Sequence, residues 1–201
     1  MNDVAERVGG APARVEGRLT RAVVWLVGSW RAMWLVLAVP IGFILTGIIV
    51  YVLHGKMGVD SAVYRSGGVA ILTGEPLYEG MTLGAEPWWA QLPFTYPPTG
   101  ALLFVPLTFL PTVVAWGVLG AVSVLSMTIV VRIVLDKVPH RPSWLNPHKA
   151  TIWASFLGLV VEPVWRTLFL GQINLILMFL VVVDVLVLAT ATSSCLIFGK
   201  P

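Results

Sequence analysis

Charged residues are scarce in this chain, and their scarcity excludes a soluble globular domain. Of its 201 residues, 11% are charged and 57% are hydrophobic, and the mean hydropathy is +0.87. Soluble domains carry about 25% charged residues, so a surface that faces water cannot be built from so few. The composition therefore predicts an integral membrane protein.

Disulfides, metal-binding patterns and nucleotide-binding loops are also missing. The single cysteine, Cys195, excludes an intramolecular disulfide. His54, His140 and His148 lack the spacing of metal ligands, and we expect no metal and no other cofactor. The sequence contains neither of the glycine-rich phosphate-binding motifs, Gly-x4-Gly-Lys-Ser/Thr and Gly-x-Gly-x2-Gly, so it does not indicate nucleotide binding. The net charge of +3 does not indicate nucleic acid, because the basic residues gather beside the apolar runs.

Long apolar runs are abundant, and the first has the length of a membrane-spanning helix. Met33 to Leu53 contains 21 residues without a charge, and about 20 apolar residues cross a hydrocarbon core of about 30 Å. Residues 1–32 form a basic leader with an interfacial helix. Cytoplasmic flanks are rich in Arg and Lys, so the N-terminus is predicted in the cytoplasm and residues 54–98 outside the cell. The leader contains Arg7, Arg14, Arg18, Arg21 and Arg31, against Asp3, Glu6 and Glu16.

The remaining apolar runs predict an all-α, polytopic helical bundle in the plasma membrane. The membrane domain extends over residues 33–189. The predicted helices after the loop cover about 99–110, 113–135, 151–161 and 173–189, with a break at Pro111 between the first two. Residues 190–201 resemble neither a span nor a tail. We expect an irregular end there, in a chain that is the N-terminal part of something longer.

The extracytoplasmic loop is predicted to contain a short helix with an acid at its start. Ser61 to Leu72 has an apolar side and ends at Gly74, and we expect it to lie along the membrane surface. Asp60 precedes it, seven residues past the first span. A carboxylate at that depth meets the head group of a lipid-linked substrate and can act as general base toward a sugar hydroxyl. Aspartate is also a preferred helix N-cap, so both interpretations stay open.

Three further loop residues are candidates for substrate binding. Tyr64 follows Asp60 by one helical turn and shares its face, while Arg65 offers a planar donor fork to phosphate. Tyr96, within the aromatic and proline-rich residues 94–98, presents a ring face to a sugar. Each has a structural alternative, because such residues also anchor helices at membrane interfaces.

A second polar cluster interrupts the C-terminal apolar runs, on the predicted side of Asp60. Charges at membrane depth are costly and usually face a cavity or a partner. Arg166 is a candidate for a lipid phosphate, and Gln172 and Asn174 for sugar hydroxyls, with Glu162 beside them. Alternatively, Glu162 and Arg166 pair with each other, since they are four residues apart.

Four stretches of the chain, taken together, resemble a known family. They are Val59 to Arg65, Gly67 to Tyr78, Leu92 to Pro98 and Gly171 to Asn174. They read Asp-x3-Tyr-Arg, Gly-Gly-x-Ala-Ile-Leu-x-Gly-x-Pro-Leu-Tyr, Phe-Thr-Tyr-Pro-Pro and Gly-Gln-x-Asn. In this order they are similar to the actinobacterial polyprenyl-phosphate-mannose-dependent α-(1→2) mannosyltransferases. These enzymes are glycosyltransferases of family 87, with the GT-C fold, and the resemblance covers about Met33 to Ala189.

The resemblance implies an inverting transfer of mannose on the outer face of the plasma membrane. The donor is polyprenyl-phosphate-mannose, and the acceptor is a glycolipid or lipoglycan of the phosphatidylinositol mannoside, lipomannan or lipoarabinomannan type. Asp60 occupies the position of the family's catalytic base, and Arg65 or Arg166 is the candidate for the leaving phosphate. No cofactor is implied, and the partners are the donor, the acceptor and membrane lipids.

Functions of other classes remain open from the sequence. A non-catalytic membrane scaffold or an inactive fragment fits the abrupt end of the chain. A transporter or flippase subunit would require ionisable residues at the midplane of several helices, and only Asp184 has such a position. Within glycosyl transfer, arabinose is an alternative to mannose, because no residue here reads the sugar.

Overall fold

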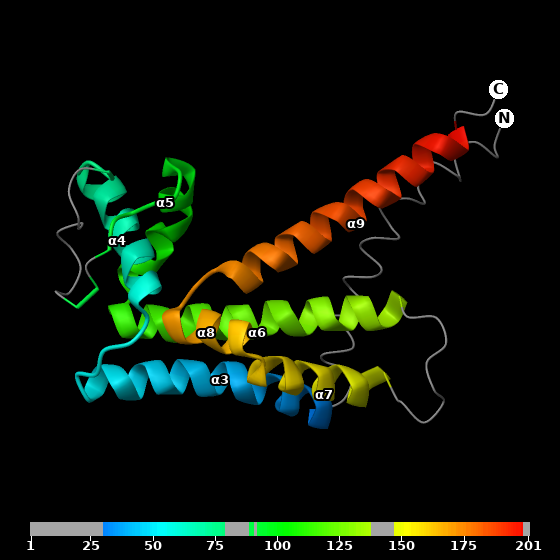
Figure 1. The fold of residues 1–201 in the computed structure, drawn as a ribbon, viewed down its shortest axis with the longest axis horizontal. Coiled ribbons are helices and arrows are strands. Elements are labelled where there is room, and N and C mark those ends of the chain that lie inside the picture. The colour runs from blue at the N-terminus through cyan, green and yellow to red at the C-terminus, as the bar shows by residue number, and fades with distance from the viewer. Residues whose placement is uncertain (1–29, 79–88, 91, 138–146, 199–201) are drawn as a thin grey trace.

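The computed structural model describes residues 30–78, 89–90, 92–137 and 147–198, and within them the chain forms helices and no β-strand (Figure 1). The prediction of an all-α chain is confirmed for these residues. The helices are α3 (Trp30–Val52), α4 (Val59–Thr73), α5 (Pro98–Phe104), the 3₁₀ helix η1 (Val105–Phe109), α6 (Thr112–Lys137), α7 (Pro147–Val160), α8 (Glu162–Leu170) and α9 (Asn174–Phe198). Most of the basic leader and part of the loop, residues 1–29 and 79–88, lie outside the described residues.

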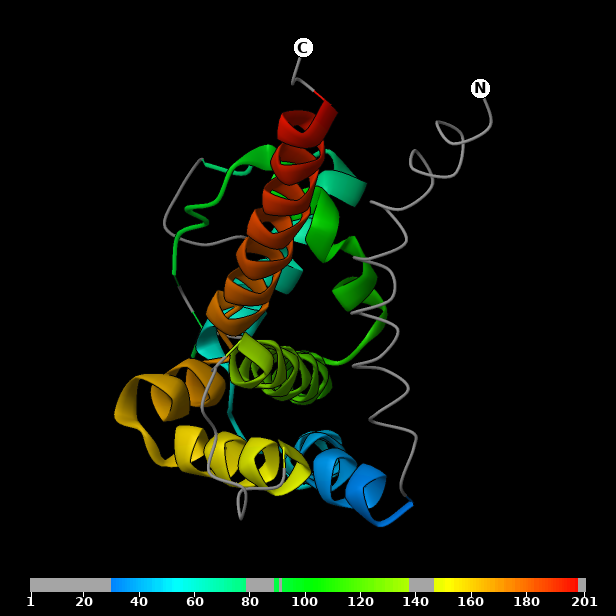
Figure 2. The ribbon, with the colours of Figure 1, turned by 90° about the vertical axis from the view of Figure 1, so that its right-hand side faces the viewer.

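α3 and α6 lie side by side along the long axis of the molecule (Figures 1 and 2). Glycines bring their backbones together: a Cβ atom on Gly117 would lie 2.7 Å from the carbonyl oxygen of Phe43. On the other helix, a Cβ atom on Gly47 would lie 3.0 Å from the carbonyl oxygen of Val113. Small residues permit such close approach between helices in membranes. Because α6 also contacts α4, α7, α8 and α9, it is the central helix.

α4, α5 and η1 pack together at one end of the α3–α6 pair (Figure 1). α4 covers the helix predicted from Ser61, and it ends at Gly74, as predicted. The predicted helix before Pro111 is present as α5 followed by η1. Pro106 lies in the first turn of η1, where the missing N–H of proline interrupts α-helical hydrogen bonding. The buried core of this end contains Val63, Tyr64, Ala70, Phe94, Ala101, Phe104, Leu107, Ala115 and Leu119.

α7 and α8 meet at a bend of 74°. The sequence predicts an interruption at this place, but the residues after it are themselves helical, from Glu162 to Leu170. Pro163 lies in the first turn of α8, where proline is tolerated because the first N–H groups of a helix have no partner within it. The polar segment is therefore a short second helix that changes direction, not a loop.

α9 diverges from α6 and extends toward the far end of the molecule (Figure 1). The prediction of an irregular end from Thr190 is wrong as far as Phe198, because α9 continues to that residue. The physical reason lies in the sequence. Neither Gly nor Pro occurs between Asn174 and Phe198, so no helix-stopping residue is present before Gly199.

Among the described residues, α6 is long and apolar enough to cross a membrane by itself, and the bent pair α7–α8 is a second candidate if it counts as one span. The described apolar stretches Val36–Val52, Pro98–Phe109 and Asn174–Leu186 are shorter. Length and composition do not distinguish a span from the core helix of a soluble protein.

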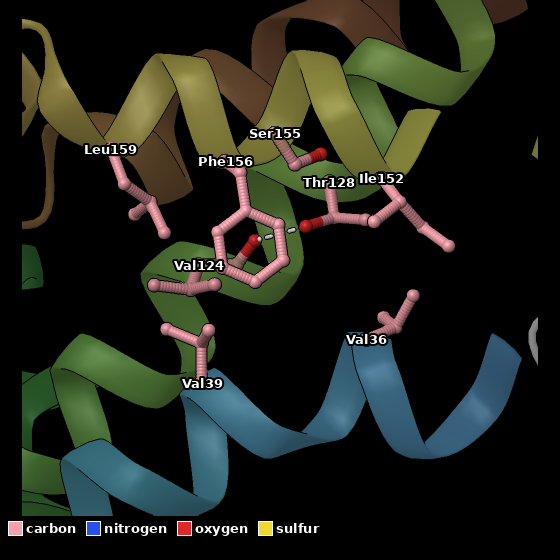
Figure 3. Close-up of a pocket in the computed structure, with 8 residues that line it drawn as sticks. All are labelled: Val36, Val39, Val124, Thr128, Ile152, Ser155, Phe156 and Leu159. Carbon is pink, nitrogen blue, oxygen red and sulfur yellow. Dashed lines mark hydrogen bonds between the residues drawn. The ribbon is translucent and has the colours of Figure 1, made fainter. Parts of the chain in front are cut away.

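A small apolar cavity lies between α3, α6 and α7 (Figure 3). Its volume is about 20 Å³, which is room for about one water-sized sphere. Val36, Val124, Phe156 and Leu159 are among the side chains that line it, and the Thr128 hydroxyl donates to the Val124 carbonyl at 2.8 Å. It is too small to hold a substrate.

Candidate active site

Asp60 lies in the first turn of α4, at the end of the molecule where α4 packs against α6. The interpretation of Asp60 as the N-cap is wrong. The N-cap position is held by Gly58, with φ of 77°, and no side chain caps this helix end. Ser61 supports the turn, because its hydroxyl donates to the Gly58 carbonyl at 2.7 Å. The Asp60 carboxylate is thus available for a partner elsewhere in the chain.

That partner is Gln172, which is 112 residues away in the sequence. The Gln172 Nε2 atom donates to Asp60 Oδ2 at 2.6 Å, and Asn174 Nδ2 donates to Gln172 Oε1 at 2.9 Å. Among the described residues, the second oxygen of the half-buried carboxylate, Oδ1, accepts no hydrogen bond. The structure therefore brings together Asp60 and two predicted residues of the second polar cluster.

Trp116 on α6 lies between the start of α4 and the end of α8 and contacts both. Its indole Nε1 donates to the carbonyl oxygens of Leu168 at 2.9 Å and of Phe169 at 3.1 Å, at the C-terminal end of α8. The side chain is 3% exposed. The predicted site does not include Trp116, since a tryptophan in an apolar run is typical of helix packing. Its N–H is the one signal, because a buried indole N–H usually has a hydrogen-bond partner.

Gly58 and Gly171 face the same indole. Both adopt left-handed backbone conformations, with φ of 77° and 76°, which glycine adopts without a steric penalty. A Cβ atom on Gly58 would lie 2.6 Å from Trp116 Cδ1, and one on Gly171 would lie 2.9 Å from Trp116 Cδ1 and from Ser61 Cβ. The start of α4 and the end of α8 therefore meet on Trp116 with no room for side chains.

Tyr64 is buried beneath the site, one turn after Asp60. Its hydroxyl is 2.9 Å from that of Tyr96, and its ring stacks on Phe104 with centroids 4.5 Å apart. Burial raises the pKa of the Tyr64 phenol far above its usual value, and the hydrogen bond and charge of Tyr96 and the charge of Asp60 act in the same direction. Tyr64 is 1% exposed, and it contacts the side chains of Tyr96 and Phe104. Tyr96 is half-buried and more open.

The three predicted charged residues are engaged within the protein. Arg65 Nε donates to the carbonyl oxygen of Leu110 at 2.9 Å, and thereby ties α4 to the junction before α6. Glu162 and Arg166 pair with each other at 3.2 Å, as the structural alternative predicted. Their side chains are 68% and 73% exposed, so the pair contributes little to stability, at most about 1 kcal/mol. Contacts of these residues with a substrate stay a prediction.

The described residues contain no group of three or more His, Cys, Asp or Glu side chains that could hold a metal ion. What the site offers chemically is a half-buried carboxylate with one oxygen fixed by an amide. Such a group can accept a proton from a hydroxyl that approaches its other oxygen.

Comparison with known proteins gives one family and several curated relatives. The sequence model of glycosyltransferase family 87 matches residues 94–199. A polyprenol-phosphate-mannose-dependent alpha-(1-2)-phosphatidylinositol mannoside mannosyltransferase of Mycobacterium tuberculosis is 34% identical over 181 residues. The protein of the same description from Mycolicibacterium smegmatis is 33% identical over 137 residues. A pentamannoside mannosyltransferase of Mycolicibacterium smegmatis is 32% identical over 130 residues.

The similarity covers most of this chain but a minor part of the relatives. The first alignment includes 85% of this chain and 40% of the Mycobacterium tuberculosis protein. The second includes 63% of this chain and 31% of its relative, and the third 64% and 30%. The chain thus spans about two fifths or less of the length of these proteins. No solved structure matches it.

Proposed function

Because the chain belongs to glycosyltransferase family 87, we propose that it forms the Asp60-bearing part of a membrane mannosyltransferase. The donor is polyprenyl-phosphate-mannose, and the acceptor is a cell-envelope glycolipid or lipoglycan of the phosphatidylinositol mannoside type. Two relatives carry that donor and that acceptor in their descriptions. The observation that carries the proposal is the 2.6 Å bond between Gln172 and Asp60, which joins both candidate clusters in one site.

The exposed surface supports an arrangement with several spans in the plasma membrane. Large apolar side chains are exposed along α3, α7 and α9, and such broad apolar faces are unfavourable in water. Examples are Leu45, Ile49, Trp153, Leu157, Leu180 and Val181, which are 53%, 56%, 67%, 67%, 54% and 61% exposed. With α3 and α6 crossing the bilayer and the N-terminus in the cytoplasm, the end that bears α4 and Asp60 lies outside the cell.

The chemistry assigned to Asp60 is general base catalysis. Asp60 takes the proton of an acceptor hydroxyl while that oxygen attacks the anomeric carbon of the donor mannose. The bond from the anomeric carbon to the phosphate oxygen breaks, and the polyprenyl phosphate leaves with the electron pair. Attack opposite the leaving group inverts the anomeric configuration. A positioned base contributes about 10²–10⁴-fold, and alignment of donor and acceptor about 7–11 kcal/mol.

The other candidates have supporting roles in this proposal. Arg65 or Arg166 neutralises the charge that develops on the leaving phosphate, and the half-buried Tyr96 offers its ring to a sugar. Glu162 is the hydrogen-bond partner of Arg166 in the structure. Tyr64 supports Tyr96 from below through the hydroxyl contact.

A transfer assay with two matched acid-to-amide variants tests the proposal. Membranes are prepared from cells that express the chain and, in parallel, from cells that express its full-length reading frame. The membranes are then supplied with radiolabelled polyprenyl-phosphate-mannose and a mannoside acceptor. We expect Asp60→Asn to lose about 10²–10⁴-fold in turnover, with unchanged membrane insertion. Glu75→Gln is the control, because Glu75 is an exposed acid at the other end of α4.

Two results contradict the proposal. If Asp60→Asn transfers mannose at the wild-type rate, Asp60 is not the general base. If the wild-type reading frame forms no product, the chain is not part of a mannosyltransferase. The second result would favour the non-catalytic membrane scaffold.

A further inference from the structure

We propose that Gln172 and Asn174 are positioning residues that orient the Asp60 carboxylate, in place of the sugar contacts that the sequence predicts for them. The proposal rests on the proposed function, because orientation matters only if Asp60 reacts. It is carried by the hydrogen-bonded series Asn174–Gln172–Asp60.

The chemistry of the three groups fixes the direction of every bond in the series. An ionised carboxylate only accepts hydrogen bonds, so Gln172 must present its NH₂ group to Asp60. The Gln172 carbonyl oxygen then faces Asn174 and only accepts, so Asn174 must present its own NH₂ group. Rotation of the Gln172 amide by half a turn would place its carbonyl oxygen against the Asp60 carboxylate and its NH₂ group against that of Asn174, so both neighbours favour the observed orientation.

The backbone beneath Gln172 is held on several sides. The Gln172 N–H donates to the Thr167 carbonyl at 2.9 Å, and the Gly171 N–H donates to the Leu168 carbonyl at 3.2 Å. Trp116 in turn donates to the carbonyl of Leu168. These bonds close the end of α8 and set the starting point of the Gln172 side chain. The Gln172 side chain thus extends to Asp60 on α4 from a backbone that is hydrogen-bonded to the end of α8.

The consequence for Asp60 is a defined carboxylate plane. A hydrogen bond between a donor N–H and an ionised oxygen is about twice as strong as a neutral one and restrains rotation of the acceptor. With Oδ2 held by Gln172, Oδ1 is the oxygen left for an acceptor hydroxyl within the described part of the site. Loss of Gln172 should therefore slow proton removal without weakening the binding of the acceptor.

Steady-state kinetics with four variants test this assignment in membranes that contain the full protein. The variants are Gln172→Ala, Asn174→Ala, Asp60→Asn and the double variant of Asp60→Asn with Gln172→Ala. We expect Gln172→Ala to lower kcat about 10- to 100-fold, the size of one hydrogen bond to a charged group, with KM for the acceptor unchanged. Asn174→Ala should lower kcat less, and the double variant should be no slower than Asp60→Asn alone.

Each other outcome overturns the assignment or the function beneath it. A raised KM with unchanged kcat would make Gln172 a substrate contact, and an additive loss in the double variant would show that it acts independently of Asp60. If Gln172→Ala fails to insert, Asn174→Ala decides, because its exposed side chain can be removed without disturbing the fold, and an unchanged kcat then refutes the series. If the wild type is active and Asp60→Asn is not, failure of these tests concerns the inference alone, whereas an inactive wild type removes both.

Discussion

Tyr64 illustrates how a single side chain of the site is controlled by its surroundings. Burial, the hydroxyl of Tyr96 and the charge of Asp60 all favour the neutral phenol, and the backbone N–H of Ile173 opposes them weakly. The pKa of Tyr64 is therefore higher in the folded protein than in the unfolded chain, where it is about 10. The folded state keeps the phenolic proton to a higher pH than the unfolded chain does. The resulting stabilisation is fully present below about pH 10 and is lost as the pH rises further.

The pH dependence of unfolding tests this description of Tyr64. Above about pH 10 the unfolded chain loses the phenolic proton first, so the free energy of unfolding falls by about 1.4 kcal/mol per pH unit from this residue. Tyr64→Phe removes that slope, although it costs about 1 kcal/mol near neutral pH through the lost bond to Tyr96. Unfolding of the purified protein in detergent across this pH range measures the slope. Tyr78→Phe, at an exposed tyrosine, is the control. Equal slopes in the wild type and Tyr64→Phe would contradict the description.

At this scale the sequence indicates chemistry but not contacts. The types and positions of Asp60 and Gln172 identify them as candidates, yet their bond depends on two glycine turns and on Trp116. The same holds for Arg65, whose bond to the Leu110 carbonyl joins groups that share no sequence pattern. A guanidinium group fits phosphate and carbonyl oxygens alike, so the residue type alone could not distinguish the two.

At the scale of elements, the ends of helices determine the site. The start of α4 and the end of α8 both turn at glycines with left-handed backbones, and both turns are packed against Trp116. The sequence predicts the end of α4 at Gly74, where a glycine marks it, and an interruption of the apolar run at Glu162 and Pro163. It does not predict that residues 162–170 are helical, since their polar side chains resemble a loop until Pro163 is placed in the first turn.

Two glycines with the same backbone conformation separate packing from backbone strain. Gly171 and Gly74 have φ of 76° and 73°, but a Cβ atom on Gly74 would meet nothing within 4 Å. Gly74→Ala should therefore cost only the left-handed backbone, about 1–2 kcal/mol. Gly171→Ala should cost more and also slow transfer, because the added methyl group displaces the support of Gln172. Thermal unfolding and the transfer assay measure both effects. Equal losses for the two variants would show that the turn on Trp116 is not tightly packed.

At the scale of the whole molecule, the arrangement separates two polar ends. Asp60, Gln172 and the α4–α5 group lie at one end of α6, and the Arg132–Asp136 ion pair lies near the other. The pattern of apolar runs predicts that Asp60 and Gln172 share a side, and their bond agrees with that. The pattern leaves open how residues 99–135 cross. In the structure α5 and η1 pack with α4 at the end of the bundle, whereas α6 lies beside α3 along the long axis (Figure 1). Pro106 and Pro111 interrupt the helix here, and a Cβ atom on Gly68 of α4 would lie 3.0 Å from the carbonyl oxygen of Phe104, so α4 and α5 pack closely. Hydropathy does not predict this contact.

The most direct measurement of the central claim replaces the acceptor hydroxyl by a nucleophile that has no proton to lose. Azide is already an anion, so it can attack the donor without a general base. The account predicts that Asp60→Ala loses transfer to the mannoside acceptor by about 10²–10⁴-fold but forms mannosyl azide of inverted configuration when azide is added. Transfer to the mannoside at the wild-type rate by Asp60→Ala would contradict the account.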